Sequence, residues 1–204
     1  SFNRAYSNSG NRVLTPEYMA LARQYDPRLK NIMERYGWYD IFLIHSNGDI
    51  VYSVEREPDL GQNLLGSELS GSSIGKAYKK ALNAGSDDVV VADFEPYAPS
   101  NGQQAAFMMA RIEDYNAELL GYIAFQIPTD RSNAIVQQHA GMGKSGETYL
   151  VGKGGDSISF RSDLKTMGDG KYIVGYDIST PYIEAALAGE TDIEVFTDSA
   201  GKLV

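Results

Sequence analysis

The stretch Trp38–Val54, WYDIFLIHSNGDIVYSV, decides the fold of this chain. Two short runs rich in Ile, Val, Phe and Tyr lie on either side of an Asn47-Gly48 pair. This pattern predicts a β-hairpin, because asparagine and glycine tolerate the positive φ angles of a tight turn. We therefore expect an antiparallel sheet to start here and to form the floor of any pocket.

A helical segment, residues 1–37, precedes the hairpin. Thr15 is a good N-cap, and Pro16 and Glu17 suit the first turn of a helix. Apolar residues then recur at helical spacing as far as Tyr36, and glycine follows. The pattern predicts a helix from about 15 to 36, or a helix pair broken at Pro27.

The residues after the hairpin complete a first module, 38–128. A loop punctuated by glycines leads to a short amphipathic helix at 72–84, and three apolar runs follow at 89–95, 105–112 and 119–127. Turn residues between these runs indicate an antiparallel meander. The order of hairpin, helix and meander is that of a PAS-like unit, so the predicted fold class is α+β.

A partial second copy of this order follows. Residues 129–143 read as a connector helix that ends in a glycine-rich run. Residues 144–204 then give a hairpin from 147–151 and 157–161, a helix at 181–188 and a strand at 192–197. We interpret 144–204 as a second, incomplete PAS-like module.

Composition and motifs argue against several functions. The 27 acidic and 18 basic residues give a net charge of -9, which disfavours a general nucleic-acid or anionic-membrane surface. The sequence has no cysteine, and its two histidines lack partners at metal-site or nucleophile spacing. The G-x-G-x-x-G match at 141–146 lies after a helix and before a strand, the reverse of a dinucleotide site. We predict no catalytic set, metal or cofactor, and therefore no enzyme.

The most suggestive polar residues are Asp93, Glu95 and Tyr97. The two carboxylates are two residues apart, so they share one face of the predicted strand at 89–95. Carboxylates beside an aromatic ring could bind an ammonium group. The alternatives are an exposed position at the strand's edge, or pairing with Arg111 across the meander.

Several motifs, in this order along the chain, resemble the double Cache sensor domains, the extracytoplasmic parts of bacterial chemoreceptors, sensor histidine kinases and related cyclases. They are WYDIFLIHSNGDIVYSVERE, DLGQNLL, VVVADFEPYAPSNGQQAAFMMARI, LLGYIAFQIP, SGETYLVGKGG and FRSD. The resemblance covers about 18–163. It implies a long dimerising helix, a membrane-distal module that binds a small ligand, and a membrane-proximal module next to a transmembrane helix. It also implies a homodimer anchored in the bacterial inner membrane and facing the periplasm.

The amino-acid-binding members of this family carry a Tyr-Asp-Pro-Arg-type signature after the hairpin. Here Tyr25-Asp26-Pro27-Arg28 lies before the hairpin and lacks the following Trp-Tyr pair, so no amino-acid specificity is carried over. From their positions on the sheet, the predicted ligand-binding residues are Trp38, Tyr52, Asp93, Glu95, Tyr97, Phe107 and Arg111.

Three functions follow as hypotheses. The first is a small-molecule sensor without catalysis, in which binding at the distal module shifts the conformation that reaches the membrane. The second is a sensor with a vestigial pocket that acts through a protein partner or its dimer interface. The third is a hydrolase or lyase that uses Asp93 and Glu95 as acid and base.

Overall fold

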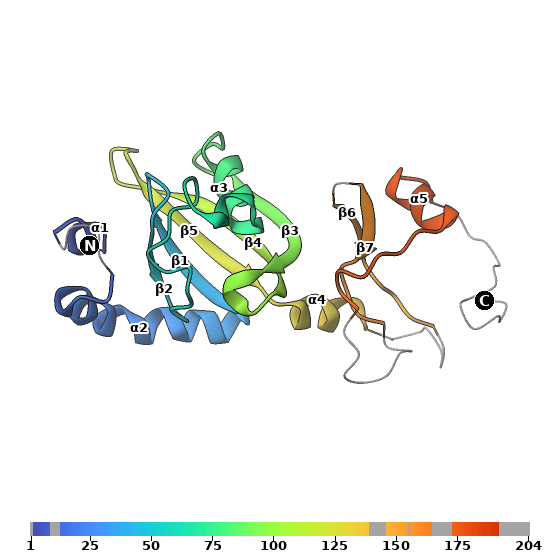
Figure 1. Ribbon diagram of the computed structural model, residues 1–204, viewed down its shortest axis with the longest axis horizontal. Coiled ribbons are helices and arrows are strands. Elements are labelled where there is room, and N and C mark those ends of the chain that lie inside the picture. The colour runs from blue at the N-terminus through green and yellow to red at the C-terminus, as the bar shows by residue number, and fades with distance from the viewer. Residues whose placement is uncertain (1, 9–12, 139–145, 155, 165–172, 192–204) are drawn as a thin grey trace. The chain divides into compact units, whose positions relative to one another are not determined.

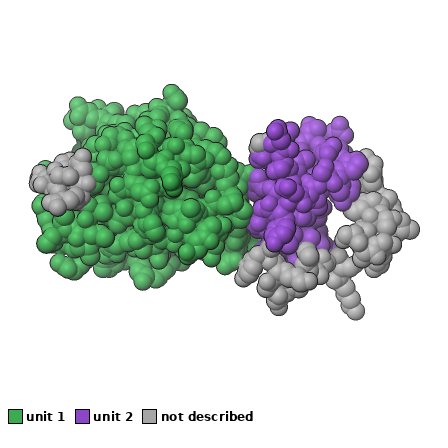
Figure 2. Space-filling model, in the orientation of Figure 1, with its two compact units in different colours: residues 1–135 green, residues 136–204 purple. Residues whose placement is uncertain are grey.

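The computed structural model describes residues 2–8, 13–138, 146–154, 156–164 and 173–191. The chain divides into two compact units, residues 1–135 and 136–204, which are coloured separately in Figure 2. The boundary lies within the predicted connector.

Two helices precede the sheet of the first unit. They are α1 (Phe2–Asn8) and α2 (Pro16–Tyr36). The Thr15 hydroxyl accepts from the N–H of Tyr18 at 3.4 Å, and Gly37 closes α2 in the left-handed region with φ of 69°. Pro27 lies inside α2 without ending it, so the segment is one helix and not a broken pair.

The first unit is built on a five-stranded antiparallel sheet in the order β2-β1-β5-β4-β3. Its strands are β1 (Asp40–His45), β2 (Ile50–Ser53), β3 (Val89–Tyr97), β4 (Gln103–Glu113) and β5 (Leu119–Ile127). Gly48 has a φ of 96° in the turn between β1 and β2, as the Asn-Gly pair predicts. The hairpin, the meander and the α+β class are confirmed.

Helices lie against both faces of this sheet (Figure 1), and each face carries its own hydrophobic core. The 3-10 helix η1 (Glu68–Gly71) and α3 (Ser73–Ala81) cover one face, where Phe42, Ile74 and Phe107 are fully buried. Helices α1 and α2 pack on the other face around Tyr18 and Tyr52. A second 3-10 helix, η2 (Ala98–Ser100), joins β3 to β4.

After β5 the chain forms α4 (Thr129–Val136), and the second unit contains β6 (Val151–Gly154), β7 (Ser157–Phe160) and α5 (Pro181–Leu187). The predicted first strand of this hairpin, 147–151, is wrong. The ladder starts with Val151 opposite Phe160 and ends with Gly154 opposite Ser157. Residues 152–154, which were expected in the turn, are therefore part of the strand. The predicted strand 192–197 lies outside the described residues, as does the glycine-rich run apart from Gly146.

Among the helices of the described residues, none has the length and apolar character needed to cross a membrane.

Candidate functional site

The structure places the seven predicted site residues in several environments. Trp38 and Tyr52 lie on the α2 side of the sheet. Tyr52 is fully buried, and its hydroxyl donates to Asp26 Oδ1 at 2.7 Å. The ring of Trp38 packs against Phe125, with 5.3 Å between the ring centroids. Both side chains therefore contribute to the packing of this face.

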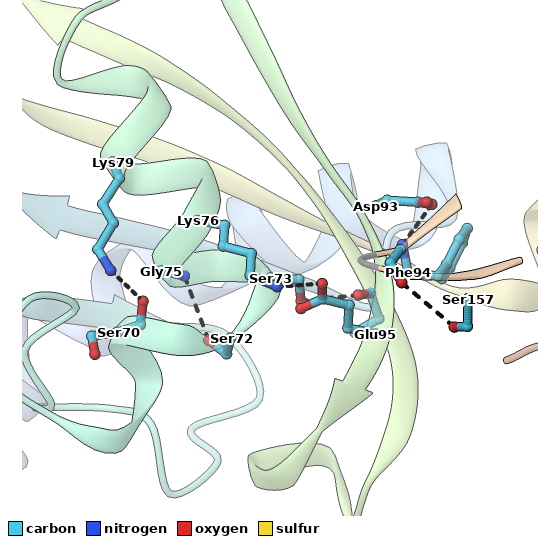
Figure 3. A network of polar contacts seen from close by, with 12 residues as sticks. Ser70, Ser72, Ser73, Gly75, Lys76, Lys79, Asp93, Phe94, Glu95 and Ser157 are labelled. Atoms are coloured by element: carbon cyan, nitrogen blue, oxygen red, sulfur yellow. Dashed lines mark hydrogen bonds and ion pairs between the residues drawn. The ribbon is translucent and has the colours of Figure 1, made fainter. Parts of the chain in front are cut away.

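The carboxylates of Asp93 and Glu95 lie on β3, which is one of the two edge strands of the five-stranded sheet. Asp93 is exposed, and a register shift between Ala92 and Glu95 interrupts the pairing with β4. Glu95 forms an ion pair with Lys76 of α3, which Figure 3 shows together with the polar residues at the start of that helix. The pairing of Glu95 is thus with α3 rather than with Arg111.

Arg111 is engaged elsewhere on β4. Its NH1 group donates to the carbonyl of Ala84 at 3.1 Å, and its Nε lies 2.9 Å from Glu113 Oε1. The contact between Nε and Glu113 is an ion pair.

Tyr97 and Phe107 are brought together on the α3 side. Both are fully buried, and their rings meet edge to face with centroids 5.1 Å apart. The Tyr97 hydroxyl donates to Asp59 Oδ2 at 2.5 Å. These two predicted residues therefore lead to a carboxylate that the sequence analysis did not select.

Asp59 belongs to a group that we call the buried polar cluster: Tyr39, Asp40, Glu57, Asp59, Tyr97, Ser100 and Gln126. Within it, Glu57 accepts from Tyr39 Oη at 2.8 Å and from Ser100 Oγ at 2.6 Å. Gln126 Nε2 donates to Ser100 Oγ at 3.2 Å. The cluster runs from half-buried Tyr39 and Glu57 to fully buried Asp59, so it extends from the surface into the core.

Strand register explains why distant residues meet here. Asp40 of β1 is opposite Gln126 of β5, and Gln126 is opposite Phe107 of β4. Residues directly opposite one another share a face of the sheet. Asp40, Gln126 and Phe107 therefore form one row on the face that α3 covers, and the loop after β2 brings Glu57 and Asp59 to it.

Asp40 anchors that loop. Its Oδ2 accepts from Ser53 Oγ at 2.6 Å, and its Oδ1 accepts from the N–H groups of Val54 and Glu55 at 2.9 and 3.2 Å. Burial raises the pKa of Asp40 to about 7, although these hydrogen bonds favour the ionised form. The side chain thus ties the start of the loop to β1.

Asp59 and Gln126 are incompletely bonded. Burial is the main cause that raises the pKa of Asp59 to about 6. Within the part of the chain that the structure describes, Asp59 Oδ1 and Gln126 Oε1 are buried and accept no hydrogen bond. Because an unsatisfied buried acceptor costs about 1–3 kcal/mol, two in one cluster are a candidate binding site.

Arg56 connects the same loop to α2. Its φ of 54° is unusual for a residue other than glycine, and its N–H donates to Ser53 Oγ at 2.9 Å. Its guanidinium pairs with Asp26 Oδ2 at 2.6 Å. The loop that carries Glu57 and Asp59 is therefore tied to both the sheet and the long helix.

The second unit has an open concavity of about 710 Å³. It is lined by residues of β6, β7 and α5 and the segment before α5, among them Lys153, Asp156, Asp177 and Glu184. Ser179 Oγ donates to Glu184 Oε1 at 2.6 Å in this region.

Sequence reasoning missed six members of the cluster: Tyr39, Asp40, Glu57, Asp59, Ser100 and Gln126. One signal was available, since Asp40 and Gln126 are polar residues at the ends of apolar strand runs. The sequence gives no signal that these two residues pair, because their pairing depends on the register between β1 and β5, which are far apart in the chain.

No family model matches this chain. Over 180 residues it is 25% identical to a probable chemoreceptor of Sinorhizobium fredii, and the match covers 88% of this chain. The chain is similar to a bacterial chemoreceptor. It spans 23% of the length of that curated relative.

Solved structures of sensor domains are also similar. The ligand-binding domain of the Pseudomonas fluorescens chemoreceptor CtaA in complex with L-leucine has a TM-score of 0.49 at 13% identity, covering 83% of this chain and 62% of that one. The sensor domain of the Vibrio cholerae histidine kinase DctB has a TM-score of 0.42 at 14% identity, covering 78% and 74%. Both of these solved structures are domains of bacterial receptors.

Proposed function

We propose that this chain is the extracytoplasmic sensing part of a bacterial transmembrane receptor, and that its first unit binds a small polar molecule. The observation that carries the proposal is the buried polar cluster with its two unpaired acceptor oxygens. The similarity to a probable chemoreceptor supports a sensing role.

The route of the signal follows from the contacts of the loop after β2. That loop supplies Glu57 and Asp59 to the cluster, and its Arg56 is paired with Asp26 of α2. A ligand that favours one position of the loop therefore also favours one state of the contact with α2. A ligand with equal affinity for both states would transmit nothing.

The setting of the receptor belongs to the same proposal. The full-length protein would be membrane-anchored, with this part on the periplasmic side and α2 in a homodimer. Its output would come from residues outside this chain, such as a chemoreceptor signalling region or a kinase.

A second candidate is a sensor whose pocket is vestigial and which acts through a partner protein or its dimer interface. The burial of both unpaired oxygens favours it, because neither atom is accessible to a ligand in this conformation. By contrast, the hydrolase hypothesis receives no support from Asp93 and Glu95, since one is exposed and the other is ion-paired.

A thermal-shift screen with amines, amino acids, carboxylates, purines and sugars tests the proposal. A ligand present at one hundred times its dissociation constant should stabilise the fold by about 2.7 kcal/mol, which is a shift of several degrees. We expect at least one class to produce such a shift. A cooperative melt that no compound moves would refute direct sensing and favour the vestigial pocket.

A further inference from the structure

Acceptor atoms are in excess in the buried polar cluster. Three of its side chains are carboxylates, from Asp40, Glu57 and Asp59, and its donors are neutral hydroxyl and amide groups. After these donors are used, Asp59 Oδ1 and Gln126 Oε1 remain without a partner among the described residues. The cluster is thus suited to bind a ligand group that donates hydrogen bonds, and not one that accepts them.

The cationic side chains Arg56 of the loop and Lys76 of α3 form ion pairs with carboxylates outside the cluster. Arg56 pairs with Asp26, and Lys76 pairs with Glu95. In the described part of the chain, the ion pairs include none between a Lys or Arg and Glu57 or Asp59. The protein itself therefore leaves the negative charge of the cluster uncompensated.

Buried charge needs compensation by a proton or by a cation that is also hydrogen-bonded. The aromatic rings of Tyr97 and Phe107 stand beside Asp59 and Gln126, as their ring contact and strand register show. Aromatic faces attract cations and cover apolar stems. Carboxylate, amide oxygen and aromatic ring together match an organic ammonium group.

We propose that the buried polar cluster binds the ammonium group of a small organic amine, with Asp59 Oδ1 and Gln126 Oε1 as acceptors and the rings of Tyr97 and Phe107 against its stem. This inference rests on the proposed sensing function and names the class of ligand. Asp59 lies on the loop and Gln126 on β5, so the bound ammonium joins the loop to the sheet.

Isothermal titration calorimetry with the purified chain tests this assignment. The probes are methylamine, ethanolamine, putrescine and agmatine, with 1,4-butanediol and succinate as the neutral and anionic counterparts of putrescine. We expect at least one amine to bind and both counterparts to be silent. Asp59→Asn should weaken that amine about tenfold or more, because it replaces a charge-assisted hydrogen bond by a neutral one.

A second variant keeps the test decisive if Asp59→Asn fails to fold. Gln126→Leu removes the other unpaired acceptor together with the donor to Ser100 Oγ, and it should weaken amine binding severalfold while lowering the stability of the fold by no more than about 1.5 kcal/mol. Asp93→Asn is the matched control on the edge strand and should bind the amine like the wild type.

Three outcomes overturn the inference. Binding of another class in the thermal-shift screen, with every amine silent, refutes the ammonium assignment and leaves the sensing function standing. Loss of amine binding in Asp93→Asn with full binding in Asp59→Asn moves the site to the edge strand. Silence of every class in that screen removes the proposed direct sensing as well.

Discussion

The contact between Asp26 of α2 and the sheet is the most informative place to perturb the fold. Asp26 accepts from the buried hydroxyl of Tyr52 at 2.7 Å and pairs with Arg56 at 2.6 Å. Asp26→Ala removes the carboxylate that both Tyr52 and Arg56 contact, so both interactions are lost at once. The variant therefore tests whether α2 is held to the loop in the way that the proposed signalling route requires.

The expected loss can be worked out from the two contacts. Leaving the Tyr52 hydroxyl without its charged acceptor should cost about 1.5–3 kcal/mol. The ion pair adds only about 0.5–1 kcal/mol, because its side chains are 26% and 29% exposed. The total is about 2–4 kcal/mol, which for a unit of this size lowers Tm by roughly 6–15 °C.

Thermal and urea unfolding measure this loss, with Glu34→Ala as the control. Glu34 is an exposed carboxylate on the same helix, so its removal makes the same change in net charge. The control should change the free energy of unfolding by less than about 0.5 kcal/mol. Equal stabilities of Asp26→Ala and Glu34→Ala would refute the link between α2 and the sheet.

Three further predictions concern stability. Tyr18→Phe should be neutral or stabilise by up to about 1 kcal/mol in urea unfolding, because the buried Tyr18 hydroxyl has no partner among the described residues; a loss above 1 kcal/mol would show that it is bonded. Asp40 and Asp59 have folded pKa values of about 7 and about 6, above the unfolded value near 3.9, so the folded state binds more protons and their contribution to stability should fall as pH rises from about 4 to 7. Asp40→Asn should flatten that slope by up to about 1.4 kcal/mol per pH unit, and an unchanged slope would contradict the burial argument. Gly121→Ala should cost more than about 3 kcal/mol, since its Cβ would lie 2.2 Å from a backbone oxygen, whereas Gly71→Ala has open space around it and should cost far less.

The hairpin and the meander could be predicted because local chemistry specifies them. The Asn47-Gly48 turn and the short apolar run at 119–127 are short-range signals, and β5 has the predicted bounds. The second hairpin was misplaced because glycines at 152 and 154 resemble turn residues, although they pair with Ser159 and Ser157. Glycine patterns alone do not distinguish a weak strand from a loop.

The candidate site was less predictable, because long-range register creates it. Tyr97 and Phe107 were selected as aromatic residues of the sheet, and they do meet. Their polar neighbours Asp59 and Gln126 come from a loop and from a strand that the sequence alone could not bring together. Asp93 and Glu95 illustrate the opposite case, since their spacing was clear but a register shift and an ion pair determine their environment.

A crystal structure of this chain with the tightest-binding amine tests the central claim most directly. We predict that the ammonium nitrogen lies within about 3 Å of Asp59 Oδ1 and Gln126 Oε1, a normal hydrogen-bond distance, and that the loop after β2 is ordered around it. Density for the amine beside Asp93 and Glu95, or in the concavity lined by Asp177 and Glu184, would contradict the account.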